Sequence, residues 1–398
     1  MQTQHYPVTD NFLEALLKSH KSRLGKVFSD PSTYRLQVIF TRIDRDEQQM
    51  PHFTDYFYGV PPDTYFYPAS TVKLPAAALA LEKINDLQIP GLHRNTPLFT
   101  DPLPDINTGV RRDPSAASGY PSVAHYIKKI FLTSDNDAFN RLYELIGQAP
   151  FNRRLWEMGY DQVQIRHRVG LPLYEAANKH TNGIVFQTGN VVLYQQEAQY
   201  SGLHFSPRQD FAGQAFYNHL DKLEAQPMNF SHRNKLPLTD LHNILRSIIF
   251  PEAVTNRQRF RLTEEDYSFL YQHMSQYPEE STDPIYDPEQ FYQAYTRFLL
   301  FGGDRNSRIP DHIRIFNKPG WAYGFLTDTA YIVDFANNTE FLLSASIFVN
   351  TSGILGDDQS AFEETGKPFL RALGEVIYAE EVQRHKKILP DLSRFKPK

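Results

Sequence analysis

The sequence predicts an α+β fold in which an antiparallel sheet is flanked by helices and carries an inserted all-helical lobe. A helix and two strands are expected first, a long and mostly helical block next, and three strands and a helix at the end. Outer segments that share one sheet satisfy this order. We therefore assign residues 1–66 and 311–380 to a sheet lobe and residues 67–310 to a helical lobe, within one domain over residues 1–398. Residues 381–398 are expected to form a polar tail.

The first elements are a helix and a pair of strands. Apolar residues at helical spacing predict a helix over residues 11–26, with Asp10 as its N-cap. Apolar and polar residues then alternate over residues 36–40, which predicts a strand, and residues 53–58 supply its return partner. The small and apolar residues that follow Lys73 are typical of a helix entering a core.

The middle of the chain alternates helical segments with irregular ones. Residues 92–120 are rich in proline, aspartate and serine, and residues 162–182 are irregular. A hairpin is expected over residues 184–194, and Thr239 and Thr263 are expected N-caps. Helical spacing predicts four helices in this block, over residues 123–132, 138–146, 240–250 and 264–274. Asp287-Pro288-Glu289, with proline at the first helical position, predicts a fifth helix over residues 287–303.

Three strands and a helix are expected at the end of the chain. The strands cover residues 313–316, 329–335 and 341–349. The last two are joined by Asn337-Asn338, a hairpin turn signal. A closing helix follows over residues 368–378, so the last strands can pair with the first two and a helix can cover them.

Composition narrows the possible partners and locations. The chain has 398 residues, 41% of them hydrophobic, and a formal net charge of -5, which gives no reason to expect a nucleic-acid partner. No apolar stretch is long enough to cross a bilayer. The first residues lack the basic and apolar regions of a signal peptide, so the chain is either cytosolic or a mature form. The absence of cysteine suits an exported bacterial protein, and we predict a periplasmic or secreted location.

Ser70 and Lys73 are the first candidate catalytic residues. Residues three apart lie on one face of a helix, so a hydroxyl and an amine are expected together where a buried helix begins. A serine is a weak nucleophile until a neighbouring base activates it. Lysine can be that base when burial or another cation lowers its pKa. The pattern alone is common, since Ser393 and Lys396 also satisfy it.

Two further patterns complete a set of three. Ser134-Asp135-Asn136 is the only Ser-x-Asn in the chain, and Lys318-Pro319-Gly320 is the only Lys-x-Gly. In this order, and in an interhelix loop and beside a strand respectively, they are similar to the second and third motifs of penicilloyl-serine hydrolases. The chain resembles class A β-lactamases and their serine-hydrolase relatives from the N-terminal helix to about Tyr378. It is longer than the family pattern near residues 187–235 and 277–287.

The resemblance implies a role for each residue that handles protons. Ser70 would be the nucleophile that accepts the acyl group, and Lys73 its base or proton relay. Ser134 would pass a proton to the leaving group. Asn136 would hold Lys73 and the substrate amide.

The third motif would bind a negatively charged part of the substrate. The resemblance implies that Lys318 adds positive charge beside the site, lowers the pKa of Lys73 and stabilises an anionic substrate. The backbone N–H groups of Ser70 and Trp321, the residue after Gly320, would form the oxyanion hole. No cofactor and no metal are implied.

Two departures from the family pattern are visible. Pro319 stands where the family has a hydroxyl residue that binds the substrate carboxylate, and proline offers neither a hydroxyl nor a backbone N–H. The family also uses a glutamate to activate the deacylating water. Glu175, with Asn178 three residues on, is the candidate here, although the family spacing is one residue longer.

These observations predict a serine hydrolase of the class A β-lactamase type that acts on an amide or ester, with β-lactams among the candidate substrates. The partner would be a small-molecule or peptide substrate. Two alternatives stay open: a penicillin-binding-protein-like or esterase-like relative that deacylates slowly, and a non-catalytic relative that binds cell-wall peptide. The sequence contains no zinc-protease helix motif, phosphate-binding glycine loop or Gly-x-Ser-x-Gly elbow.

Overall fold

A central antiparallel sheet organises the computed structural model, which describes residues 8–61, 64–350, 352–357 and 360–397. Within these residues the sheet has six strands in the order β12-β14-β15-β1-β2, and β13 pairs with β14. The strands are β1 (Gln37–Arg45), β2 (Pro51–Tyr58), β12 (Ile313–Asn317), β13 (Gly320–Ala322), β14 (Phe325–Asp334) and β15 (Thr339–Phe348). The first and last segments of the chain therefore share one antiparallel sheet, which confirms the predicted α+β fold class.

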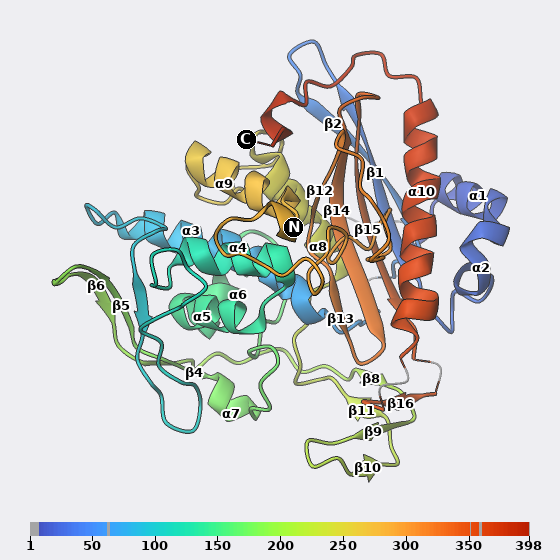
Figure 1. Ribbon diagram of the computed structural model, residues 1–398. Helices are drawn as coiled ribbons and strands as arrows, with labels where there is room; N and C mark the ends of the chain where they lie inside the picture. Colours follow the sequence, from blue (N-terminus) through green and yellow to red (C-terminus); the bar gives the residue numbers. More distant parts are fainter. Residues whose placement is uncertain (1–7, 62–63, 351, 358–359, 398) are drawn as a thin grey trace.

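Helices cover both faces of this sheet (Figure 1). On one face, Phe341 and Leu343 of β15 belong to an apolar cluster with Phe369 of α10, outside which α1 and α2 lie. On the other face, Leu342 belongs to a second cluster that includes Leu241 of α8. All ten residues of β15 are buried because the sheet has no solvated face there. The helices are α1 (Asn11–Ser19), α2 (Lys21–Ser29), α8 (Leu238–Ile249), α9 (Glu264–Ser275) and α10 (Lys367–Gln383).

A lobe of helices lies beside the sheet (Figure 1). It is built from α3 (Lys73–Leu87), α4 (Val123–Thr133), α5 (Asn136–Ile146) and α6 (Gln148–Glu157). The first ten residues of α3 are buried, because α4 and α5 pack against it. A small sheet of β3 (Leu98–Thr100), β5 (Ile184–Thr188) and β6 (Val191–Gln196) closes the outer side of the lobe, and it contains the predicted hairpin.

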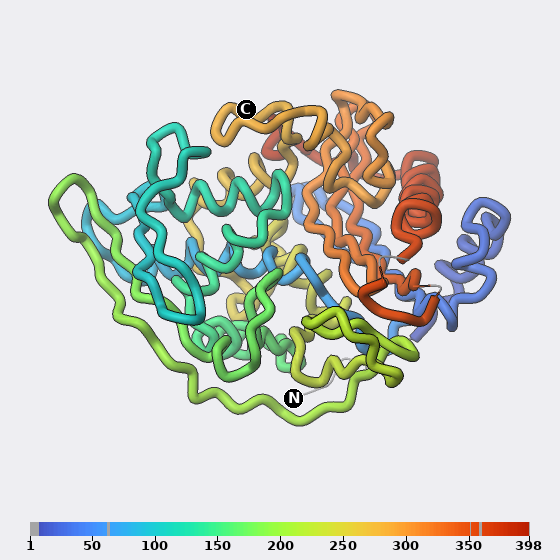
Figure 2. The backbone as a smooth tube through the Cα atoms, turned by 60° about the horizontal axis from the view of Figure 1, so that its bottom comes forward, coloured from blue at the N-terminus to red at the C-terminus, as the bar shows by residue number. Residues whose placement is uncertain are grey.

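The segment between β6 and β8 runs along the outside of the helical lobe toward the sheet (Figure 2). It leads into short strands below the sheet, where β9 pairs in parallel with β16. The elements of this region are α7 (Glu175–Asn178), β4 (His180–Thr181), β7 (Gln199–Tyr200), β8 (Phe211–Ala212), β9 (Ala215–Tyr217), β10 (Leu223–Glu224), β11 (Met228–Asn229) and β16 (Ile354–Leu355).

The helix predicted over residues 287–303 is absent, and that segment is a series of turns. The carboxylate of Asp328 accepts hydrogen bonds from the backbone N–H groups of Phe298 and Leu299, at 3.2 and 3.1 Å. The buried guanidinium of Arg297 occupies the same region. Buried side chains thus satisfy backbone groups that a helix would have satisfied internally. Tertiary contacts thus override the helix start signal at Asp287-Pro288-Glu289.

Helix starts agree with the sequence at two positions and differ at a third. Asp10 caps α1 by accepting from the Phe12 N–H, and Thr263 forms a capping box at α9, as predicted. The helix expected to begin at Asp240 begins at Leu238 instead, so Thr239 lies inside it and is not its N-cap. The helix predicted over residues 11–26 is divided into α1 and α2.

The last residues do not form the polar tail that was predicted. Leu392 and Phe395 are buried, and the Phe395 ring lies 4.9 Å from the ring of Tyr331 and 5.4 Å from that of Phe316. Two apolar residues in a mostly polar stretch were sufficient to dock it on the sheet, because each covers aromatic surface. The closing helix also extends to Gln383, beyond its predicted end.

Candidate active site

Ser70 lies at the junction between the sheet and the helical lobe. It belongs to a 3₁₀ turn over Ala69–Val72 that leads directly into α3, and Ala69 has a φ of 45°. A non-glycine residue in this left-handed region is strained, and such strain is concentrated at functional sites. Lys73 begins α3 and is fully buried, whereas Ser70 is partly exposed. The Lys73 Nζ donates a hydrogen bond to the Ser70 Oγ at 2.8 Å.

The corner between α4 and α5 brings the second motif to this pair. Ser134 ends α4 with a φ of 59°, and Asp135 is the N-cap of α5, accepting from the Ala138 N–H at 2.7 Å. Because Asp135 caps the helix, the Ser134 hydroxyl is not used for capping. The Lys73 Nζ donates to the Ser134 carbonyl oxygen at 2.5 Å and to the Asn136 Oδ1 at 2.7 Å, and lies 3.3 Å from the Ser134 Oγ.

The third motif supplies a second buried amine. Lys318 lies between β12 and β13, and its Nζ donates to the Ser134 Oγ at 2.8 Å and to the Pro319 carbonyl oxygen at 2.8 Å. The Ser134 hydroxyl therefore lies between two lysine amines. Pro319 contributes a backbone acceptor to the site.

Burial changes the proton affinity of both lysines. Desolvation lowers the pKa of Lys73 to about 7, against an opposing contribution from the Asp135 carboxylate. The pKa of Lys318 is lowered well below its ordinary value, first by burial and next by the charge of Lys73. The resemblance implied that Lys318 depresses the pKa of Lys73. Desolvation is instead the cause that lowers it, because Lys73 is fully buried.

Gly320 allows the third motif to approach Ser70. A Cβ at this position would lie 2.6 Å from the Pro68 carbonyl oxygen and 2.9 Å from the backbone nitrogen atoms of Ser70 and Thr71. The absence of a side chain lets β13 pack directly on the serine turn. Trp321, the next residue of β13, is therefore held beside that turn, and its ring packs against Phe298 at 5.2 Å.

Glu175 is placed differently from the other candidate residues. Its carboxylate is paired with Arg166 at 3.2 Å and with the His232 Nδ1 at 2.9 Å, and its side chain is 39% exposed. In the described structure no hydrogen bond or ion pair joins it to Ser70 or Lys73. The loop residue that lies against the Asn136 amide is Gly170, where a Cβ would come within 2.7 Å of the Asn136 Nδ2.

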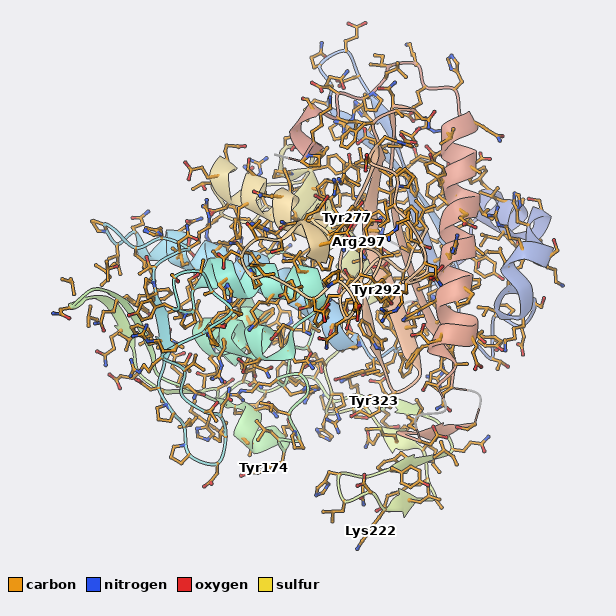
Figure 3. The ribbon with its side chains drawn as sticks, in the orientation of Figure 1. Tyr174, Lys222, Tyr277, Tyr292, Arg297 and Tyr323 are labelled. Atoms are coloured by element: carbon orange, nitrogen blue, oxygen red, sulfur yellow. The ribbon has the colours of Figure 1, made fainter. Side chains whose placement is uncertain are left out.

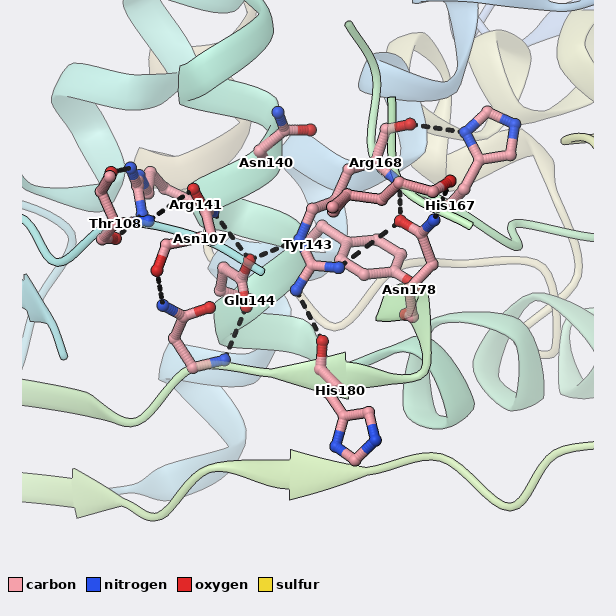
Figure 4. A network of polar contacts seen from close by, with 12 residues as sticks. Asn107, Thr108, Asn140, Arg141, Tyr143, Glu144, His167, Arg168, Asn178 and His180 are labelled. Carbon is pink, nitrogen blue, oxygen red and sulfur yellow. Dashed lines mark hydrogen bonds and ion pairs between the residues drawn. The ribbon is translucent and has the colours of Figure 1, made fainter. Parts of the chain in front are cut away.

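A buried ion pair holds this loop on α5 (Figure 4). The Arg168 Nε donates to the Glu144 Oε1 at 2.6 Å, and neither side chain is exposed to solvent. Glu144 also accepts from the Asn182 N–H at 2.7 Å, and the Asn178 Oδ1 accepts from the Arg168 N–H at 3.0 Å. Glu144 is a functional-site residue that the sequence did not predict. A charged residue on the apolar face of a helix is the feature of the sequence that could have identified it.

Aromatic rings form the wall beside Ser70. Tyr67 is buried and lies 5.3 Å from Tyr323 and 5.7 Å from Phe230, centroid to centroid. Tyr323 is partly exposed, has a φ of 52° and lies at the lower end of the sheet, on the side where Tyr174 extends from α7 (Figure 3). The residues just before Ser70 are thus part of the apolar core.

The described residues provide neither a candidate metal site nor a candidate membrane-spanning helix. In the described part of the chain, histidine, aspartate and glutamate side chains form no group of three that could hold a metal ion. None of the described helices combines the length and apolar character needed to cross a membrane.

Comparisons with solved structures return β-lactamases and a related protein. A β-lactamase from Xanthomonas campestris is 17% identical and aligns with 93% of this chain and 100% of its own, at a TM-score of 0.49. One from Sphaerobacter thermophilus is 12% identical over 90% and 97% of the two chains, at 0.48. A mutant of PBP-A in an acyl-enzyme complex with penicillin G is 14% identical over 91% and 97%, at 0.49. A search of curated proteins finds no match.

The sequence itself identifies the class. The model of the beta-lactamase enzyme family matches residues 23–263, which include Ser70, Lys73, Ser134 and Asn136. The chain belongs to this family. Membership of this family indicates a hydrolase.

Proposed function

We propose that this chain is a serine hydrolase of the class A type that cleaves an amide or ester through an acyl-enzyme on Ser70. The contact that supports the proposal is the 2.8 Å hydrogen bond between the Lys73 Nζ and the Ser70 Oγ. Burial brings the pKa of Lys73 to about 7, so a large fraction of the amine is neutral near physiological pH. A neutral amine at this distance can accept the serine proton.

The contacts of Lys73 and Ser134 support the following acylation step. The Ser70 Oγ forms a bond to the substrate carbonyl carbon while its proton passes to the Lys73 Nζ. The electron pair of the carbonyl double bond moves to oxygen, and the N–H groups of Ser70 and Trp321 stabilise that oxyanion. Ser134 then gives its proton to the leaving nitrogen or oxygen and is reprotonated by the Lys73 ammonium. The bond to the leaving group breaks, and an ester on Ser70 remains.

An anionic group on the substrate fits the third motif. Lys318 places a buried amine beside Ser134, and buried amines attract anions more strongly than exposed ones do. Pro319 offers no hydroxyl to a carboxylate, so Lys318 carries this recognition without help from its neighbour. A small molecule or peptide with a carboxylate near the scissile bond is the substrate class we propose, and β-lactams are one member of it.

Slow deacylation is a second candidate property, favoured by the position of Glu175. Both of its oxygens are engaged by Arg166 and His232, and Gly170, without a side chain, lies against Asn136. With both oxygens in ion pairs, this carboxylate is not free to hold a deacylating water. The chain would then behave as a penicillin-binding protein does and hold its acyl group.

Burst kinetics with nitrocefin test the proposal. We expect one equivalent of product per protein molecule in a burst, with a steady state after it whose rate measures deacylation. Ser70→Ala should show neither phase. A wild-type protein that is folded but gives no burst and no turnover, with nitrocefin and with a simple thioester, would refute the acyl-enzyme proposal.

A further inference from the structure

A buried polar cluster lies directly behind the strand that carries Lys318. It consists of Asn317, Asp328 and Arg297, all fully buried. The Asn317 Nδ2 donates to both oxygens of Asp328, at 2.9 and 3.1 Å, and the Asn317 Oδ1 accepts from the Arg297 Nη1 at 2.6 Å. Figure 3 shows Arg297 beside the strands of the sheet. The chemistry described above does not use these three side chains.

Strand register places Asp328 opposite the third motif. The last pair between β12 and β14 joins Asn317 to Ala330, and the first pair between β13 and β14 joins Gly320 to Thr327. Asp328 is therefore the residue that faces Pro319. The Lys318 N–H donates to the carbonyl oxygen of Thr329 on β14 at 3.1 Å, which fixes the register of Lys318 relative to β14.

The Asn317–Asp328 pair and the Lys318 side chain lie on opposite faces of the sheet. Side chains alternate along a strand, and Ile313 and Ile315 of β12 belong to the apolar cluster under α10, as Ala330 of β14 does. Asn317 and Asp328 share that face. Lys318 points to the other face, toward Ser134. Asp328 can thus act on Lys318 only through the strand and through its electric field.

Charges of both signs surround Lys318. Lys73 of α3 and Arg297 of the segment before β12 disfavour its ammonium form, whereas the Asp328 carboxylate favours it. Burial raises the pKa of Asp328 to about 6, against hydrogen bonds from Asn317 and Leu299 and the charges of Arg297 and Lys318. Asp328 is therefore ionised at neutral pH. It is the carboxylate that offsets two cations and desolvation at Lys318.

We propose that Asp328 is a positioning residue that, through Asn317 and the strand, keeps Lys318 charged and directed at Ser134. The inference rests on the acyl-enzyme function proposed above for its kinetic consequence, but the charge state of Lys318 can be measured without it. Asp328→Asn removes the negative charge and keeps the volume of the side chain. Lys318 should then lose its proton at a lower pH, by about one unit or more.

The direct test is an NMR titration of lysine labelled with ¹³C at Cε. The Lys318 signal is identified by its loss in Lys318→Arg. We expect its titration midpoint in Asp328→Asn to lie about one pH unit or more below that of the wild type. Glu340→Gln is the matched control, because Glu340 is also a buried carboxylate of this sheet and pairs with Arg45, away from Lys318. The proposal is overturned if the midpoint is unchanged, or if Glu340→Gln lowers it equally.

A wild-type measurement covers the case in which Asp328→Asn does not fold. The Lys318 Cε signal should then show a second, smaller shift as Asp328 titrates near pH 6, and the absence of that shift contradicts the proposal. The kinetic counterpart is the alkaline limb of Ser70 acylation by an anionic substrate, which should move to lower pH with the Lys318 midpoint. A wild type that is not acylated refutes the proposed function alone, since the NMR midpoints still decide the role of Asp328.

Discussion

The α-carbon of Gly320 is so close to the Ser70 turn that a side chain at position 320 would place its Cβ 2.9 Å from the Ser70 backbone nitrogen. Real Cβ atoms do not approach backbone this closely. The contact joins a strand near the end of the chain to a turn near its beginning. We propose that this contact positions the N–H groups of Ser70 and Trp321 to stabilise the oxyanion.

Gly320→Ala should push β13 away from the serine turn. We expect a loss of about 1–3 kcal/mol in the free energy of unfolding, typical of added atoms in a packed site, and a fall in the acylation rate of at least about tenfold. Chemical denaturation and the rate of acyl-enzyme formation measure the two effects. Gly202→Ala is the control for stability, because a Cβ built there has no heavy atom within 4 Å and its φ lies outside the left-handed region. An unchanged acylation rate in Gly320→Ala would show that the approach does not position the oxyanion hole.

The acylation rate should depend on pH through Lys73. Lysine is a base only when neutral, and its pKa here is about 7, so the rate should rise with pH and level off above about 7. Each pH unit below the pKa reduces the neutral fraction about tenfold, which predicts a rate about 100-fold lower at pH 5. Rapid mixing with a chromogenic substrate over pH 5 to 8 measures it.

Lys73→Arg is the matched variant for this test, because a guanidinium keeps the positive charge and cannot lose its proton. We expect acylation to be lost with little change in fold. Two results would contradict a general base at Lys73: a rate that does not vary with pH in the wild type, or an arginine variant that is acylated normally.

Glu175→Gln should leave deacylation almost unchanged, within about threefold, because the carboxylate is held by Arg166 and His232. The measurement is the decay of the acyl-enzyme by intact mass after excess substrate is removed. If the glutamine variant is acylated and then fails to release its acyl group while the wild type turns over, Glu175 is the deacylating base and the slow-deacylation alternative is wrong.

Glu144→Gln should lower the free energy of unfolding of the protein. It leaves the fully buried Arg168 without its carboxylate, which typically costs about 3–5 kcal/mol in the free energy of unfolding. Glu14→Gln removes an exposed ion pair with Lys18 and should cost about 0.5 kcal/mol or less. Urea denaturation compares the two. Equal effects would mean that the Glu144–Arg168 pair does not stabilise the loop.

The sequence predicted those parts of the molecule that depend on short-range patterns. Alternation and turn residues predicted the strands, and the Asp10 and Thr263 caps were read from local residue types. The spacing of Ser70 and Lys73 brought the two side chains to one face. These features need only neighbours within a few positions.

Other parts depend on contacts between distant residues. Residues 287–303 begin with a helix start signal, but Asp328, farther along the chain, accepts from the backbone N–H groups of Phe298 and Leu299. Phe395 docks on Tyr331 across the sheet, which no local pattern could show. Lys318 was identified by its motif, whereas its dependence on Asp328 is visible only in the strand register.

Acylation of Ser70 is tested most directly by mass spectrometry of the protein after incubation with a penicillin and, separately, with a fluorophosphonate. We expect one adduct per chain, located by peptide mapping on Ser70, and its loss in Ser70→Ala. No adduct with either reagent on a folded wild-type protein, or an adduct that persists in Ser70→Ala, would contradict acylation of Ser70.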